Sequence, residues 1–156
     1  MNKYKHTYSQ FDVLMASPTD PLPKEKRDRQ LTKIRLCMVS IEQSPHPTLE
    51  QWEVLSDIVN MMQTLLETKL IEDRDDVIGD AITALAKAGT RHLEKKVPIR
   101  FEGRDIAMLH GVIEDYEMVI ENLPARTMLA IHRKTEKRVQ DILAGRCKQE
   151  DVRVSI

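Results

Sequence analysis

Apolar residues recur at intervals of three and four along five stretches of the chain, and this spacing places them on one side of an α-helix. We expect helices from residue 24 to the prolines of "SPHP", from 48 to the polar break "EDRDD", and over roughly 76–95, 104–122 and 124–145. The clearest apolar side belongs to the second of these helices and consists of Trp52, Leu55, Ile58, Val59, Met62, Leu65 and Leu66.

Helix-terminating residues support several of these boundaries. Thr48 and Gln51 are spaced as a capping box, in which each side chain binds the other residue's backbone amide. Pro124 suits the first turn of a helix, and Gly145 suits the left-handed residue that ends one. The third helix has an unusually small inner side, with Ala81, Ala84, Ala88 and Gly89, so a neighbouring helix can come close.

Five helices joined by short connections predict an all-α protein, a compact antiparallel bundle of four to five helices with an extended N-terminal arm. We divide the chain into the arm at 1–23, the bundle at 24–145 and a C-terminal tail at 146–156. The connector "KKVPIRFEG" between the third and fourth helices is expected to be locally extended.

The arm contains the proline-rich stretch "SPTDPLP", which disfavours helix. Before it lies "FDVLM", where alternation places Phe11, Val13 and Met15 on one side of an extended strand. Together with Leu14, these residues either fold back on the bundle or bind a partner protein or a second protomer. We take them as candidate partner-binding residues.

The net charge of −1 indicates no general attraction to nucleic acid or membrane. Charge is nevertheless sorted along the chain: residues 48–80 carry nine acids and two bases, a net of −7, whereas residues 125–148 carry seven bases and two acids, a net of +5. Two cysteines, Cys37 and Cys147, form neither a metal motif nor a disulfide framework, which favours a reduced cytoplasmic location. We expect neither a signal peptide nor a membrane span.

The basic residues of the last helix are candidate phosphate contacts. Helical projection puts Arg126, Arg133 and Lys137 on one stripe opposite the apolar side, and Lys134 and Arg138 belong to the same basic group. The alternative is that they neutralise the acidic helices, within the bundle or between protomers. No aromatic residues lie among these bases, which argues against stacking on single-stranded nucleic acid.

The stretch "HGVIEDYE" raises the question of a metal or proton-transfer site. Projection places His110, Glu114, Glu117 and Glu121 on one stripe outside the apolar side of their helix, so we interpret them as a solvated face. His92 and His132 instead project toward the core. Each is either a histidine satisfied by one buried hydrogen bond or a pH-sensitive polar contact.

Catalytic motifs are absent from the sequence: there is no Gly-rich phosphate loop, no His-Glu-x-x-His, no Cys-x-x-Cys and no Gly-x-Ser-x-Gly elbow. Neither cysteine has a histidine close in sequence. We therefore expect a protein that is not an enzyme and that needs no cofactor or metal. An enzyme would require His92 or His132 to meet a carboxylate in a cleft.

The stretches "LEQWEVLSDIVNMMQTLLE", "GDAITALAKAGTRH" and "GRDIAMLHGVIEDYEMVIENLPARTMLAIHRKTEKRV" resemble small helical accessory proteins of proteobacterial phages, prophages and plasmids. The resemblance spans roughly residues 31–143. It implies a mobile-element protein that binds, and inhibits or redirects, a host or defence component. The expected function is therefore that of a non-catalytic, protein-binding factor. The apolar residues of the arm and of the helices predict that it forms a homodimer. The alternative is a nucleic-acid-binding regulator that uses the basic face of the last helix.

Overall fold

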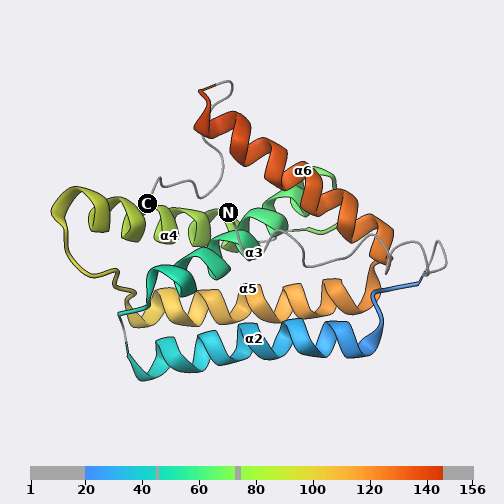
Figure 1. Cartoon of the computed structure of the whole chain (residues 1–156), viewed down its shortest axis with the longest axis horizontal. Coiled ribbons are helices and arrows are strands. Elements are labelled where there is room, and N and C mark those ends of the chain that lie inside the picture. Colours follow the sequence, from blue (N-terminus) through green and yellow to red (C-terminus); the bar gives the residue numbers. More distant parts are fainter. Residues whose placement is uncertain (1–19, 45, 73–74, 146–156) are drawn as a thin grey trace.

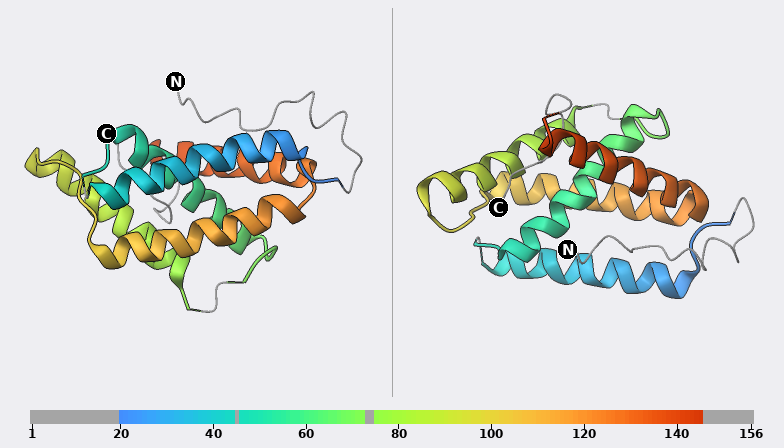
Figure 2. Two further views of the ribbon diagram at one scale, coloured as in Figure 1. Left: turned by 90° about the horizontal axis from the view of Figure 1, so that it is seen from below. Right: turned by 45° about the horizontal axis from the view of Figure 1, so that its top comes forward.

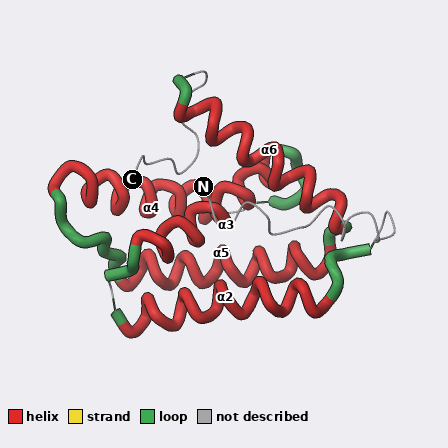
Figure 3. The backbone as a smooth tube through the Cα atoms, in the orientation of Figure 1, coloured by secondary structure: helices red, strands yellow, loops and turns green. Residues whose placement is uncertain are grey.

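The structure is a computed structural model, and it describes residues 20–44, 46–72 and 75–145. These residues form five helices and no strand: α2 (Lys24–Gln43), α3 (Leu49–Glu67), α4 (Val77–Lys95), α5 (Gly103–Asn122) and α6 (Ala125–Leu143) (Figures 1 and 3). The prediction of an all-α bundle is confirmed. The residues that the sequence assigns to the outer arm and the tail lie outside the described residues, apart from positions 20–23.

The helix α3 lies at the centre of the bundle. Helices α2 and α5 lie side by side and antiparallel, and α3 crosses them obliquely, with α4 and α6 packed on its other sides (Figures 1 and 2). Because it contacts all four other helices, α3 is buried around most of its circumference, including the polar residues Ser56, Asn60 and Thr64.

The start of α3 is the predicted capping box. The backbone amide of Gln51 donates to the Thr48 hydroxyl at 3.1 Å, and the Thr48 amide donates to the Gln51 side-chain oxygen at 3.0 Å. The Gln51 amide group also donates to the Ser40 hydroxyl at 2.9 Å, which ties the beginning of α3 to the end of α2. One local sequence signal therefore fixes a helix boundary and the packing of two helices.

The small inner side of α4 allows close packing on α3. Ala81, Ala88 and Gly89 are buried, and the indole nitrogen of Trp52 donates to the backbone carbonyl of Leu85 at 3.0 Å. The Leu85 carbonyl belongs to the backbone of α4 and already accepts a hydrogen bond within that helix. The Trp52 indole can reach it only because α3 lies close to α4, and the short side chains of α4 permit this approach.

Residues 20–23, which the sequence assigned to the arm, are attached to the bundle. Leu22 belongs to the core with 1% of its surface exposed, and the Asp20 carbonyl accepts from the backbone amide of Ala125 at 2.8 Å. Residues 20–23 are therefore part of the bundle. A single leucine between prolines carries no periodicity, which is why the sequence did not place it in the core.

Pro124 differs from the sequence-based expectation, whereas Gly145 agrees with it. Pro124 is the residue before the first turn of α6, where its extended backbone joins α5 to α6. Asp76 precedes α4 in a left-handed conformation, with φ 52°, and its side chain makes no capping hydrogen bond. Gly145 has φ 74°, the left-handed conformation expected after the last helix.

The connector between α4 and α5 is extended and anchored. Ile99 and Phe101 are buried, at 3% and 2% exposure, and Arg100 between them is exposed. This alternation is what an extended backbone gives when one side lies on the core. The connector therefore holds Arg100 at the surface in a defined position.

Candidate binding surfaces

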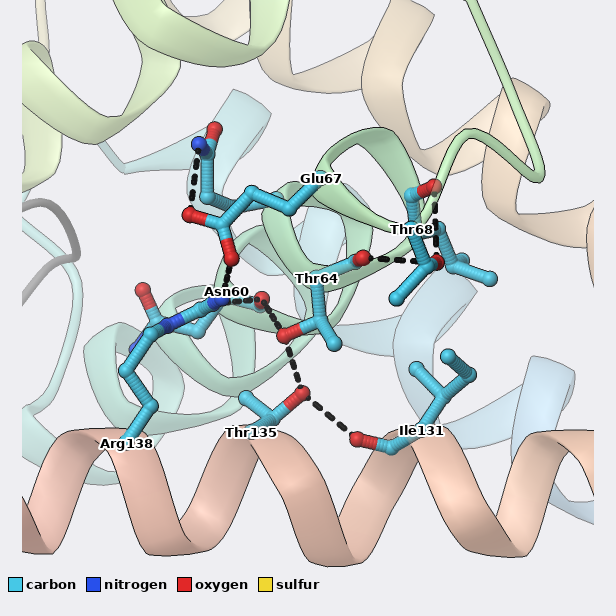
Figure 4. A network of polar contacts seen from close by, with 9 residues as sticks. Asn60, Thr64, Glu67, Thr68, Ile131, Thr135 and Arg138 are labelled. Atoms are coloured by element: carbon cyan, nitrogen blue, oxygen red, sulfur yellow. Dashed lines mark hydrogen bonds and ion pairs between the residues drawn. The ribbon is translucent and has the colours of Figure 1, made fainter.

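The first polar cluster lies between α3 and α6 and is internal (Figure 4). The hydroxyls of Thr64 and Thr135 share a hydrogen bond of 2.6 Å. Each hydroxyl also lies within hydrogen-bond distance of a backbone carbonyl oxygen one turn earlier in its own helix. Next to them, Arg138 forms an ion pair with Glu67 and donates to the Asn60 carbonyl at 3.1 Å. We call this set the α3–α6 seam.

Arg138 therefore does not belong to the exposed basic face that the sequence predicted. Its side chain is only 14% exposed, and its charge is directed at α3. Projected on α6, Arg138 lies roughly 60° from the buried Thr135, at the edge of the core-facing arc. Helical projection therefore separates Arg138 from the exposed bases that lie next to it in the sequence.

The other four predicted phosphate contacts are exposed: Arg126, Arg133, Lys134 and Lys137. Among the described residues, Arg133, Lys134 and Lys137 have no ion-pair partner. Pairing with an acidic helix of the same bundle therefore accounts for Arg138, but not for Arg133, Lys134 and Lys137.

His132 lies at the opposite edge of the same core-facing arc and is half-buried. It lines a pocket of about 270 Å³ together with Asp57 and Glu136. A histidine and two carboxylates therefore share one pocket between α3 and α6, which is the arrangement that a catalytic reading required. The pocket is, however, smaller than the range of about 300–1,000 Å³ that is usual for small-molecule sites.

His92 fixes the connector. It is half-buried near the end of α4, and its Nδ1 lies 2.7 Å from the carbonyl oxygen of Val97, so that nitrogen carries the proton and donates. His46 lies in the same way 3.3 Å from the carbonyl oxygen of Ile99. Of the two interpretations of His92, the geometry matches a histidine satisfied by one hydrogen bond.

The "HGVIEDYE" stripe is less solvated than the sequence suggested. The imidazole Nε2 of His110 contacts a carboxylate oxygen of Glu42, and Glu117 accepts two hydrogen bonds from Arg35, at 2.8 and 3.0 Å. The hydrogen bond to Glu117, followed by the charge of Glu117, raises the pKa of the Arg35 guanidinium. His110 and Glu117 thus join α5 to α2, while Glu114 remains exposed.

A second charged region, which the apolar periodicity does not indicate, lies between α4, the connector and the start of α5. A cleft of about 630 Å³ is lined there by Lys87 and Arg91 of α4, Arg100 of the connector, and Glu102, Arg104 and Asp105 of the α5 start. Ala84, Ala88 and Met108 line its apolar part. We call this region the α4–α5 cleft.

The bases of the α4–α5 cleft differ in their partners. Arg104 lies 3.5 Å from a Glu102 oxygen and 4.0 Å from an Asp105 oxygen. Lys87, Arg91 and Arg100 are exposed and have no ion-pair partner among the residues that the structure describes. A charge count would have found them, since residues 81–101 contain five bases and one acid, a net of +4.

Cys37 is buried between α2 and α3. Burial raises the pKa of its thiol to about 11, so the thiolate that nucleophilic chemistry requires is disfavoured. Its sulfur lies 3.8 Å from the Gln51 carbonyl oxygen. Cys147 lies outside the described residues.

The remaining predicted site residues, Phe11, Val13, Leu14 and Met15 of the arm, also lie outside the described residues. Within residues 20–44, 46–72 and 75–145, no group of three or more histidine, cysteine, aspartate or glutamate side chains is placed to hold a metal ion. Nor does any helix in these ranges have the length and apolar character to cross a membrane. No protein-family model matches the chain, and neither a curated protein nor a solved structure does.

Proposed function

We propose that this protein is a non-catalytic binding protein whose partner is another protein, held on the side of the bundle that carries the α4–α5 cleft. The observation that supports the proposal is the group of three exposed bases, Lys87, Arg91 and Arg100, around a cleft with an apolar part. Charged residues that serve the fold have partners within the chain, as Arg138 and Arg35 do. Bases left on two walls of a cleft are instead placed to meet the groups of another molecule.

The setting of this function belongs to the same proposal. The resemblance to accessory proteins of phages and plasmids suggests a host or defence component as the partner, whose action is inhibited or redirected in the cytoplasm. A homodimer is part of the proposal as well, with the arm, including Phe11 and Met15, as the segment that reaches a partner or a second protomer.

Affinity capture followed by reconstitution tests the proposal. The full-length protein is immobilised, exposed to a lysate of the cells that carry the gene, and the recovered protein is purified and titrated back by calorimetry. We expect one stoichiometric protein partner, bound less tightly when Lys87, Arg91 and Arg100 are all changed to glutamate. Recovery of no stoichiometric protein partner would contradict the proposal.

Catalysis in the pocket of His132 is not our conclusion, because its volume of about 270 Å³ leaves little space for a substrate. The lining residues also include Met61, Val139 and Leu143, so much of that space is bounded by apolar side chains. We expect the substitution His132→Ala to leave partner binding unchanged, because His132 lies between α3 and α6 and does not line the α4–α5 cleft.

A nucleic-acid-binding regulator is the second candidate, and the exposed stripe of α6 favours it. Arg126, Arg133 and Lys137 lie on one side of a helix and are all exposed, so they could follow a phosphate backbone. Titration of a labelled DNA duplex at several salt concentrations tests this. Each base that contacts a phosphate lowers the slope of log affinity against log salt by about one unit when it is removed. Arg138→Ala should leave that slope unchanged, because Arg138 is occupied by Glu67.

A further inference from the structure

We infer that the α4–α5 cleft binds an acidic segment of the partner protein, in which carboxylates are interspersed with small apolar side chains. The inference rests on the proposed function, since it names the chemistry of the partner at that site. The inference goes beyond the proposed function because it pairs the carboxylates of the partner segment with Lys87, Arg91 and Arg100.

The cations stand on two different walls. Lys87 and Arg91 are one helical turn apart on α4, so their side chains share one face of that helix. Arg100 comes from the connector, where buried neighbours on both sides and the His92 hydrogen bond to Val97 hold the backbone. An anionic segment lying in the cleft is therefore approached from both walls.

The helix dipole does not account for these bases. Cations stabilise a helix C-terminus only within about its last turn. Lys87 lies two turns before Lys95, the last residue of α4, and Arg100 follows the end of the helix. Lys95 fits the dipole explanation, whereas Lys87 and Arg100 do not.

The carboxylates of the lining favour a protein over a nucleic acid. Asp80, Glu102 and Asp105 line the same cleft, and a continuous phosphate backbone would pass close to them. Glu102 and Asp105 are engaged in the capping of α5 and with Arg104, so their negative charge is fixed in place. A peptide can carry its carboxylates only where the free bases are and present neutral groups to the rest of the cleft.

The apolar part of the cleft fits such a segment. Ala84 and Ala88 are one turn apart on α4, and Met108 faces them from α5. Short side chains leave room, and methionine adapts its shape to different apolar contacts. An alanine or leucine next to a partner carboxylate would therefore be buried at little steric cost.

Nuclear magnetic resonance of the full-length, ¹⁵N-labelled protein tests this inference, because the Nε–Hε signals of arginines report contacts of the guanidinium directly. The probe is a short synthetic peptide of glutamate, alanine and leucine, and its control has glutamine in place of glutamate. A DNA duplex and inorganic phosphate are titrated separately. We expect the glutamate peptide to give saturable shifts of the Arg91 and Arg100 signals, and the glutamine peptide to give none.

Matched variants complete the test. Arg91→Glu should weaken binding of the glutamate peptide roughly ten-fold, which corresponds to about 1.4 kcal/mol. Arg133→Glu, an equal charge change on α6, should bind it like the wild type. Equal binding of the glutamine peptide, tighter binding of DNA at the same arginines, or the absence of a saturable shift would overturn the inference.

The inference and the proposed function fail in different ways. If a captured protein partner binds Arg91→Glu as tightly as the wild type, the cleft is not its site. The inference is then wrong, and of the proposed function only the binding of a protein partner stands. If no stoichiometric protein partner is captured at all, the proposed function itself is wrong.

Discussion

The α3–α6 seam and the α4–α5 cleft are both places where basic residues of one element face another element, yet their bases end in opposite situations. Arg138 in the seam is largely buried, paired with Glu67 and bonded to a backbone carbonyl. Lys87, Arg91 and Arg100 around the cleft are exposed and have no such partner among the described residues.

The difference follows from what the neighbouring helix supplies. Next to Arg138, α3 contributes a carboxylate and a carbonyl, and these contacts offset part of the cost of withdrawing the charge from water. Next to Lys87 and Arg91, the start of α5 contributes carboxylates that its own cap and Arg104 already engage. A base becomes part of the fold where its neighbour has an uncommitted acceptor, and it stays available for another molecule where its neighbour has none.

The largest effect on stability is expected at the anchor of the cleft. Phe101→Ala removes a buried aromatic side chain, and such truncations cost about 3–5 kcal/mol of unfolding free energy. Urea unfolding measures the loss. Arg100→Ala, the exposed neighbour, is the control and should change the free energy by less than about 0.5 kcal/mol. Similar costs for the two variants would show that the connector is not anchored as described.

The next effect is expected in the seam. Arg138→Ala removes a largely buried guanidinium together with its ion pair to Glu67 and its hydrogen bond to the Asn60 carbonyl, which should cost about 1–3 kcal/mol. Arg133→Ala, on the exposed side of the same helix, should cost almost nothing. Equal urea midpoints for the two variants would contradict the division of α6 into a paired and an exposed set of bases.

A third effect is absent at neutral pH and appears only in alkaline solution. The folded Cys37 thiol has a pKa of about 11, above its ordinary value of 9.0, so the unfolded chain loses this proton first as the pH rises. Unfolding is then favoured, and the contribution of Cys37 to stability falls between pH 9.0 and about 11.

The Cys37 thiol adds to the comparison of paired and exposed bases a side chain that burial keeps uncharged. Unfolding free energies of the wild type and of Cys37→Ala, both carrying Cys147→Ser, are compared across that pH range. Their difference should be constant below pH 9.0 and should shrink above it. A difference that stays constant throughout would mean that the Cys37 thiol is not shielded from water.

The smallest effect on stability is expected for the bases of the cleft. Arg91→Glu should shift the unfolding free energy by less than about 0.5 kcal/mol, because Arg91 is exposed and has no ion-pair partner within the described chain. The same variant should show the roughly ten-fold weaker peptide binding described above. A large loss of stability would place Arg91 with Arg138, as a residue that serves the fold.

The apolar periodicity alone determined most of the architecture. Spacings of three and four located all five described helices, and the predicted apolar side of α3 is buried at Trp52, Leu55, Ile58, Val59, Met62 and Leu65. The capping box at Thr48 and the left-handed Gly145 were also readable, because both depend only on residues close in sequence. Local rules of this kind hold whatever the rest of the chain does.

Only the tertiary structure decided which polar residues remain at the surface. Projection assigns a residue to one side of its helix, but it cannot say which helix covers that side or which acceptors that helix offers. For this reason Arg138 was expected at the surface and lies in the seam, and His110 and Glu117 were expected in solvent and contact α2.

The α4–α5 cleft shows the same limit from the other direction. Its bases come from a helix and from a connector that is not helical. The buried side chains of Ile99 and Phe101 together with the His92 hydrogen bond bring them to one place. The sequence by itself determined the helices, the capping box that begins α3, the glycine that follows α6 and the basic character of residues 81–101. Which of those charges share a cleft was decided by the packing of α4, α5 and the connector, because contacts between distant residues depend on the whole core.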